Sequence, residues 1–394
     1  MTRTWTRRER LLATLRGEAV DRPAVCFYEI GGLRMDPSDP DPFNIYTDPS
    51  WHPLLELAEQ ETDLIRLRSA VRADSHVAWD RGGEGPPRSV REELLTSRTW
   101  DQDGCRLTHL TLRAGGRELT SLLRREPDTD TLWTVEHLIK DQDDLLAYLQ
   151  LPDAFFDEAI SLEPLRAEEQ ALGDRGIVMV DTEDPLCAAA TLMSMQDYTI
   201  VAFTENALFH QLLEKLARQI HLRTEQVARE FPGHLWRIYG PEYASEPYLP
   251  PRLFEEYVVR YVTPMVHAIH EHDGFARIHC HGRVRHILDL IVGMGADAID
   301  PLEPPPLGDV SLAEVRQQYG QQLVLFGNLE IVDIERMEPR AFDDVVCRAL
   351  AEGTAGSGRG FVLMPSACPV GRKVEPRTLR NYQTMVRRAT TWGG

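Results

Sequence analysis

Two histidines one residue apart form the most chemically suggestive pattern of the sequence, His-Cys-His-Gly at residues 279–282. The run before them, Phe275 to His279, is apolar and short enough for a buried strand. Side chains alternate along an extended chain, so His279 and His281 are expected on one face and Cys280 on the other. Paired imidazoles on one face can bind a metal ion.

A second apolar run, Ala298 to Leu302, leads directly to Glu303, and the sequence between the two runs, Arg283 to Gly293, has helical spacing. A strand, a helix and a second strand predict a βαβ unit, in which both strands end at the same edge of a parallel sheet. His279, His281 and Glu303 are therefore expected to converge.

The remaining sequence repeats this alternation of strand and helix. Eight apolar runs, each followed by helical sequence, begin at Ala24, Asp63, Gly176, His234, Phe275, Ala298, Leu323 and Phe361. This content predicts an α/β fold, a (β/α)₈ TIM barrel forming a single domain over residues 1–394. Short alternating runs at about 73–132, around an Ala-Gly-Gly turn, predict a β-hairpin insertion after the second strand. A doubly wound open sheet is the competing architecture, although no GxGxxG follows the first strand.

The composition excludes several kinds of partner. The 394 residues carry a formal net charge of -19, which repels phosphate backbones and anionic lipid, so neither nucleic acid nor membrane is an expected partner. No run approaches the roughly 18 apolar residues that span a bilayer, and the basic first residues lack a signal-peptide core. We therefore expect a cytoplasmic protein that acts on a small molecule. The six scattered cysteines predict free thiols rather than disulfides.

In parallel α/β folds the residues at the carboxyl ends of the strands form the site. Two imidazoles, a carboxylate and a thiolate suit Zn²⁺, which takes nitrogen, sulfur and oxygen ligands. The predicted metal ligands are therefore His279, His281, Glu303 and Cys368. Each has a structural alternative, since a histidine can cap a helix, Cys368 can fill the core and Glu303 can be a solvated loop residue.

The other residues at predicted strand ends are candidates for catalysis or substrate binding. For catalysis they are Asp181, Tyr239 and Glu242. For substrate binding they are Tyr28, Glu29, Arg68 and Asn328. Structural roles compete here too, because Asp181 suits a turn, Asn328 suits a helix cap and Arg68 suits the surface.

The order of several segments resembles that of the uroporphyrinogen decarboxylase superfamily over nearly the whole chain. These segments are RERLLATLRG, HCHG, GADAIDPLEPPPLGD, FGNLE and PSACPV. The resemblance implies a (β/α)₈ barrel. The decarboxylase branch of the superfamily is metal-free and binds an acidic tetrapyrrole through an arginine-bearing segment after the first strand. In this chain that segment corresponds to Glu29 and the three residues after it, none of which is an arginine. The zinc methyltransferases of the superfamily carry His-x-Cys-Gly and a later Cys, which correspond to His279, Gly282 and Cys368, with His281 replacing the first Cys.

The resemblance implies a zinc-dependent methyltransferase that moves a methyl group between a corrinoid or methylated small molecule and a heteroatom acceptor. The more distant cobalamin-independent methionine synthases add a glutamate, to which Glu303 corresponds. Because His281 replaces a thiolate, another divalent metal is an alternative ion. Trp79 stands where the cobalamin-binding motif after His76 expects glycine, so a corrinoid is expected on a separate protein. Family members are often homodimers. The competing functions are a decarboxylase or lyase acting on a small carboxylic acid and a non-catalytic tetrapyrrole- or corrinoid-binding barrel.

Overall fold

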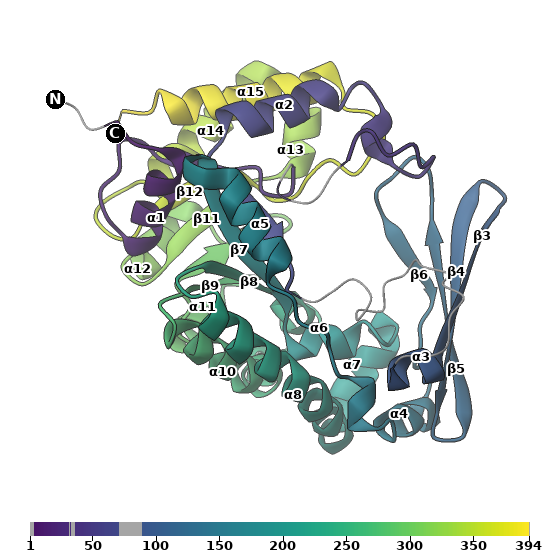
Figure 1. Ribbon diagram of the computed structural model, residues 1–394. Helices are drawn as coiled ribbons and strands as arrows, with labels where there is room; N and C mark the ends of the chain where they lie inside the picture. The colour runs from purple at the N-terminus through teal and green to yellow at the C-terminus, as the bar shows by residue number, and fades with distance from the viewer. Residues whose placement is uncertain (1–3, 31, 33–35, 71–88, 394) are drawn as a thin grey trace.

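The computed structural model describes residues 4–30, 32, 36–70 and 89–393. Its centre is one curled sheet of eight strands in which every neighbouring pair is parallel (Figure 1). All eight predicted strands are confirmed. In sheet order they are β1 Ala24–Val25, β12 Phe361–Pro365, β11 Val324–Leu329, β10 Ala298–Asp300, β9 Phe275–His279, β8 Leu235–Tyr239, β7 Gly176–Glu183 and β2 Leu64–Arg68.

The sheet curls far enough for its two end strands to meet. The amide of Asp63, just before β2, donates to the carbonyl of Val25 in β1 at 2.8 Å. Further along, the amide of Leu67 donates to the carbonyl of Gly32 at 2.9 Å. The result is an α/β fold like a TIM barrel, in which the carboxyl ends of all the strands surround one opening.

Residues on the two faces of the sheet belong to two separate apolar clusters. The inner cluster contains Met179, Leu235, Phe326 and Met364, and the outer cluster contains their neighbours in sequence, which pack under the helices. Two buried faces explain why the strands read as continuous apolar runs. Cys280 belongs to the outer cluster, on the opposite face from His279.

Helix α1, Arg7–Arg16, closes the amino-terminal end of the barrel by placing Leu11 and Leu15 in the inner cluster. The helix is held there by Asp63, whose side chain is fully buried. The Asp63 carboxylate accepts hydrogen bonds from Arg10 at 2.6 Å, from Arg22 at 2.8 Å and from the amide of Val25 at 3.0 Å. One carboxylate thus joins α1 to both end strands.

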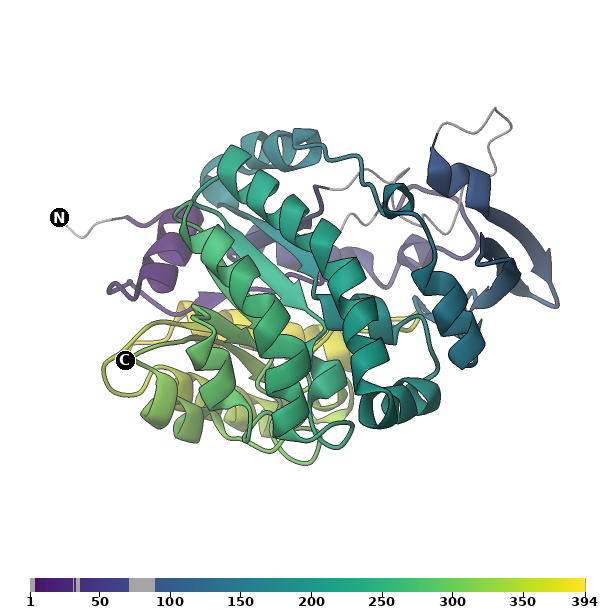
Figure 2. The same cartoon turned by 90° about the horizontal axis from the view of Figure 1, so that it is seen from below.

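The other helices cover the outer face, and α8 and α10 lie side by side along it in Figures 1 and 2. None of the helices in the described ranges is long and apolar enough to cross a bilayer. The helices that cover the outer face are α2 His52–Glu61, α5 Glu163–Leu172, α6 Pro185–Ala190, α7 Met195–Thr204, α8 Asn206–Glu230, α9 Pro251–Phe254, α10 Arg260–His270, α11 Leu288–Gly293, α12 Leu312–Tyr319, α13 Ile331–Arg336, α14 Pro339–Gly353 and α15 Pro376–Thr390.

The segment between β2 and β7 contains a four-stranded antiparallel sheet, which stands beside the barrel in Figure 1. Two of its strands, β4 and β5, pair across the turn at Gly115 and Gly116. Its strands are β3 Leu95–Gln102, β4 Cys105–Ala114, β5 Arg117–Arg125 and β6 Leu132–Glu136, flanked by α3 Val90–Leu94 and α4 Gln142–Leu149. The remainder of the predicted insertion, including His76 and Trp79, lies outside the described residues.

Two predicted boundaries are wrong. The helix expected from Arg283 begins only at Leu288, because the amides of the preceding turn are bound by Asp309. Strand β10 ends at Asp300 rather than Leu302, since Pro301 has no amide hydrogen to continue the ladder. The second boundary matters because it makes Asp300, and not Leu302, the last residue of the strand.

Helix α12 offers a test of local stability. Ser311 accepts a hydrogen bond from the amide of Glu314 at 3.2 Å, and the Glu314 carboxylate accepts one from the amide of Ser311 at 3.0 Å. We expect Ser311→Ala to lower the free energy of unfolding by about 1 kcal/mol, measured by urea denaturation. Gln317→Ala, at an exposed position of the same helix, should change it by less than about 0.5 kcal/mol.

Candidate active site

The two histidines lie at the carboxyl end of β9, and each is paired with a carboxylate from the next strand or its loop. Asp300 is the residue opposite His279 in the β9–β10 ladder. The Nδ1 atom of His279 lies 2.8 Å from Oδ2 of Asp300, and both side chains are buried. Asp300 was not predicted as a site residue.

Glu303 holds the second histidine together with the backbone that follows it. One carboxylate oxygen lies 2.9 Å from Nδ1 of His281, and the other accepts the amide of Gly282 at 2.7 Å. The rings of His279 and His281 are nearly perpendicular, with centroids 4.7 Å apart. The predicted convergence of these two histidines with Glu303 is therefore present in the structure.

The two imidazoles differ in protonation because their surroundings differ. Burial lowers the pKa of His279 to about 4, although the Asp300 carboxylate opposes this change. Burial would also lower the pKa of His281, but the hydrogen bond and charge of Glu303 raise it to about 9. At neutral pH the site thus combines a neutral imidazole with an imidazolium.

A buried ion pair lies beneath His279 in the barrel. Arg277 and Asp300 are both fully buried, with Nε and Oδ1 3.0 Å apart. The Arg277 guanidinium also lies 4.6 Å from the ring centre of Tyr28 and 5.0 Å from that of Phe326. Asp300 therefore balances one buried cation while it orients His279, and these interactions hold its pKa well below the usual range despite burial.

A second inward-facing arginine links three of the predicted residues. Arg237 lies 3.5 Å from Asp181, and its guanidinium is 4.9 Å from the ring centre of Tyr239 and 5.7 Å from that of Tyr28. Burial raises the pKa of Asp181 to about 6, against the opposing charge of Arg237. Asp181, Tyr239 and Tyr28 therefore line the inside of the barrel mouth.

Glu330 is a further acidic group near the histidines that sequence reasoning missed. It lies at the start of α13, and one of its oxygens accepts a hydrogen bond from Ser366 at 3.0 Å. Burial, followed by the negative charge of Glu303, raises its pKa to about 7. A carboxyl group with this pKa can accept or donate a proton near neutral pH.

Two other predicted site residues, Glu242 and Glu29, form hydrogen bonds with neighbouring groups of the protein. Glu242 accepts the amide of Gly240 at 3.0 Å, and burial raises its pKa. Glu29 accepts a hydrogen bond from the Tyr28 hydroxyl at 3.1 Å and the amide of Cys368 at 2.8 Å. Burial and the Glu29 charge raise the pKa of the Cys368 thiol, and in the described part of the chain no hydrogen bond joins Cys368 to a histidine.

Arg68 does not have its predicted role, and for Asn328 the structure removes the competing role of a helix cap. In β2 the inner positions are Ile65 and Leu67, so the alternation places Arg68 on the outer face, where it pairs with Glu168 at 2.5 Å. Asn328 lies within β11 and does not cap α13, whose N-cap residue is Glu330. Asn328 is nevertheless nearly buried at the barrel end.

Of the four predicted metal ligands, His279 and His281 have surroundings that suit a bound metal ion. A metal-bound histidine usually has its second nitrogen bonded to a carboxylate, as Nδ1 of His279 and His281 are here. The two Nε2 atoms have no hydrogen-bond partner among the described residues. Within the same residues, however, no group of three or more His, Cys, Asp or Glu lies close enough to hold a metal ion.

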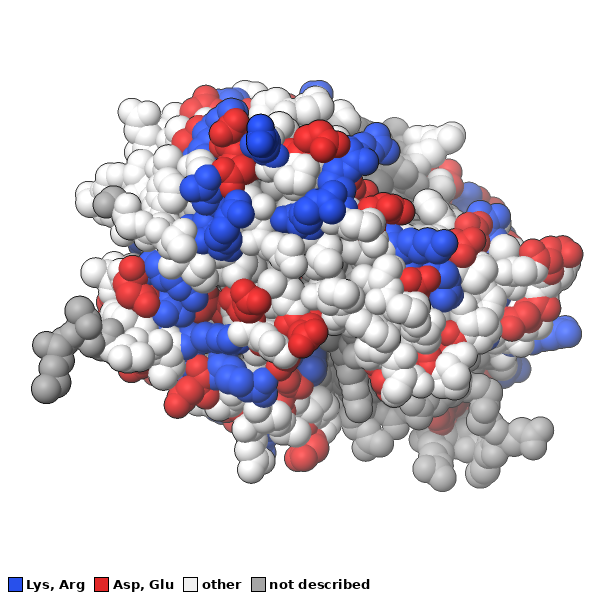
Figure 3. Space-filling model, turned by 90° about the horizontal axis from the view of Figure 1, so that it is seen from above, with Lys and Arg blue, Asp and Glu red and all other residues white. Residues whose placement is uncertain are grey.

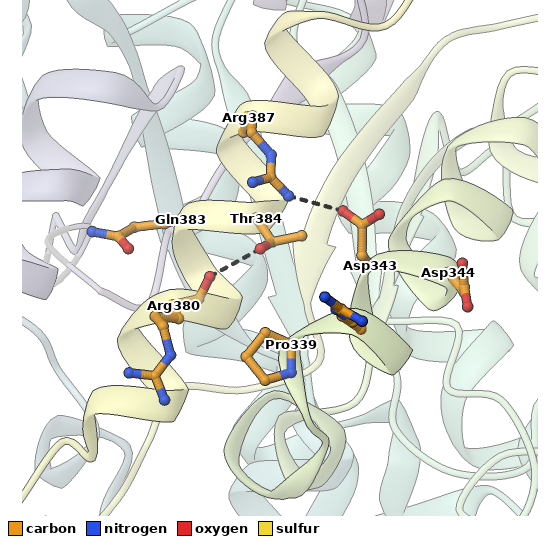
Figure 4. Close-up of a pocket in the computed structure, with 8 residues that line it drawn as sticks. Pro339, Asp343, Asp344, Arg380, Gln383, Thr384 and Arg387 are labelled. Carbon is orange, nitrogen blue, oxygen red and sulfur yellow. Dashed lines mark hydrogen bonds and ion pairs between the residues drawn. The ribbon is translucent and has the colours of Figure 1, made fainter.

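The outer surface also carries a polar hollow of about 600 Å³, between α14 and α15. In Figure 4 Arg387 donates to Asp343 at 2.9 Å, and the Thr384 hydroxyl donates to the backbone carbonyl of Arg380 at 3.0 Å. Figure 3, which views the molecule from above, shows basic side chains interspersed with acidic ones on that face. This hollow lies between two outer helices, so we do not assign the active site to it.

Eight parallel strands and a cluster of ionisable side chains at their carboxyl ends define a TIM-barrel-like α/β protein with one site at the barrel mouth. The model of the family described as uroporphyrinogen decarboxylase (URO-D) matches residues 134–389, well over half of the chain. The protein belongs to this family.

The chain is also similar to several solved structures, whereas a comparison with curated proteins finds no match. A methyltransferase from Methanosarcina mazei shares 15% identity with a TM-score of 0.59, over 98% of this chain and 99% of the other. At this identity the likeness shows the fold alone. D-psicose 3-epimerase (TM-score 0.34, 10% identity, 64% and 88% of the chains) and muconate lactonizing enzyme from Pseudomonas putida (0.25, 10%, 75% and 76%) support no inference.

Proposed function

We propose that the protein is a zinc-dependent methyltransferase that moves a methyl group from a corrinoid or a methylated small molecule to a heteroatom acceptor. The observation that carries the proposal is the histidine pair, in which Asp300 and Glu303 hold the Nδ1 atoms of His279 and His281. The two carboxylates orient both rings through Nδ1, as in metal-bound histidines, and metal binding at His281 requires its imidazolium to lose the Nε2 proton. The family match and the fold shared with a methyltransferase agree with it.

The protein's own residues position the reactants and move the proton. His279 and His281 would hold the zinc ion, which would supply Lewis-acid chemistry that lowers the pKa of the acceptor heteroatom. Glu330, with a pKa near 7, accepts the proton that the acceptor loses. The acceptor lone pair forms the new bond to the methyl carbon, and the electron pair of the broken bond leaves with the donor. A corrinoid donor arrives on a separate protein.

Metal analysis and methyl transfer test this proposal together. We expect about one zinc ion per purified chain and zinc-dependent demethylation of methylcobalamin or a methylated small molecule in the presence of a thiol, alcohol or amine. His279→Ala should lose the metal and reduce the rate about 100-fold or more. His267→Ala, at an exposed position of α10, is the matched control and should keep both. A metal-free wild-type protein with no transfer would contradict the proposal.

Cys368 is the predicted ligand whose role the same measurement decides. Zinc loss in Cys368→Ala would support the ligand set of His279, His281, Glu303 and Cys368. Zinc retention in that variant would restrict the set to the histidines and their neighbouring carboxylates.

The opposite pKa shifts of the histidines favour a second candidate, a lyase that decarboxylates a small acid without metal. In that reaction the bond to the carboxyl carbon breaks, its electron pair stays on the substrate carbon, and the His281 imidazolium supplies the replacing proton. Carbon dioxide release by metal-free protein would identify this activity. A protein that binds a tetrapyrrole or corrinoid without turnover would indicate a carrier.

A further inference from the structure

A cavity of about 500 Å³ lies between the antiparallel sheet β3–β6 and the barrel. One wall consists of inward-facing side chains of β4 and β5, among them Leu110, Leu112 and Leu123. The opposite wall includes Leu216 and Ile220 of α8. Small-molecule sites usually measure about 300–1,000 Å³ and have mostly apolar walls, and this cavity meets both conditions.

The inner end of the cavity lies against the candidate active site. Glu183 and Tyr239, at the carboxyl ends of β7 and β8, both line it. Tyr239 is the residue opposite His279 in the β8–β9 ladder, and Arg237 packs against its ring. Tyr239 is therefore shared between the cavity and the barrel mouth.

The charged groups around the cavity balance each other. Arg223 binds both oxygens of Glu158, at 2.7 and 2.9 Å, and one oxygen of Glu183, at 2.9 Å. Arg91 is the cation among the residues that line the cavity in the described part of the chain, and it lies 5.2 Å from the ring centre of Phe155, whereas Arg223 lies behind the wall and binds its two glutamates. Two arginines offset two glutamates, so the cavity favours an uncharged occupant over an ionic one.

The outer end of the cavity reaches solvent at the edge of the small sheet. Leu132 and Thr134 of β6 line it, and both are exposed, Leu132 by 47% of its surface. Because the walls are mostly apolar, a ligand that enters here replaces solvent with apolar contacts.

We propose that this cavity binds an uncharged, mainly apolar or aromatic small molecule, with its polar end toward Tyr239. The inference deepens the proposed function and rests on it for one point, that the molecule is the substrate whose reacting heteroatom lies at the Tyr239 end. The binding itself does not depend on methyl transfer.

The test uses the uncharged fluorescent probe N-phenyl-1-naphthylamine with the whole protein. We expect a saturable rise in fluorescence with one probe per chain, and weaker binding of an anionic naphthalene sulfonate. Ala188→Trp, which fills the cavity from α6, should weaken probe binding about tenfold or more. Thr134→Trp fills it from β6, at an exposed position that tolerates a large side chain. Leu146→Trp, on the exposed face of α4 and outside the cavity, is the control and should bind as wild type.

Wild-type probe affinity in both folded cavity variants, or no saturable binding at all, would overturn the inference. Probe binding blocked by both variants, in a protein without zinc or methyl transfer, would keep the cavity assignment while the proposed function fails. Methyl transfer with the wild-type KM in both variants would show that the substrate does not bind in the cavity, while the proposed function would stand.

Discussion

Asp300→Asn is expected to lower the free energy of unfolding by about 3–5 kcal/mol, because the fully buried Arg277 then loses its counter-charge. The amide can still contact His279 but no longer supplies a negative charge. The same variant should therefore also bind zinc about 10–100-fold more weakly. Urea denaturation measures the first effect and competition with a metal indicator measures the second.

Asp289→Asn is the matched control for the Asp300 variant. Asp289 lies on α11, exposed to solvent, and accepts a hydrogen bond from the Tyr319 hydroxyl at 2.8 Å. An exposed amide can accept the same bond, so the free energy of unfolding should change by less than about 0.5 kcal/mol. A stability loss in Asp300→Asn no larger than this would contradict the role of Asp300 as the counter-charge of Arg277.

Asp63→Ala should have a comparable effect at the opposite end of the barrel. The substitution leaves Arg10 and Arg22 without a shared carboxylate and removes the acceptor of the Val25 amide. We expect a loss of about 3–5 kcal/mol in the free energy of unfolding, measured by urea denaturation.

Asp21→Ala provides the comparison for Asp63, because it removes a different partner of the same Arg10. The Asp21 side chain is 37% exposed, whereas that of Asp63 is fully buried. Water screens the exposed pair, so we expect a loss of only about 1 kcal/mol. Equal losses in the two variants would show that burial of Asp63 does not determine its contribution.

The strands could be predicted because burial on both faces makes each one a continuous apolar run. A site residue could be predicted where its position along the strand, and so the face and end of the sheet it occupies, was assigned correctly. His279 was found from its place at the end of β9, and the parallel arrangement brought Glu303 beside His281. Arg68 was misplaced because its alternation with Ile65 and Leu67 was not followed.

Asp300 was missed because the predicted strand continued to Leu302. Glu330 was missed because its hydrogen bond with Ser366 joins the ends of two different strands. A signal for Asp300 was present, since a carboxylate directly follows two buried apolar residues in Ala-Ile-Asp and an arginine interrupts the neighbouring run Phe-Ala-Arg-Ile-His. Charges inside buried runs indicate an internal ion pair. Neither the hydrogen bond between the Cys368 amide and Glu29 nor the cavity beside β3–β6 follows from spacing along the chain.

The small sheet supplies one wall of the cavity, yet β3, β4 and β5 all precede residue 134, where the family match begins. The histidine pair and its carboxylates lie within the matched region. The proposed ligand cavity is thus built partly outside the matched region, whereas its opposite wall and the histidine pair lie inside that region. Exchanging residues 95–125 between related proteins would be a modular route to new ligand preferences that leaves the reacting groups untouched.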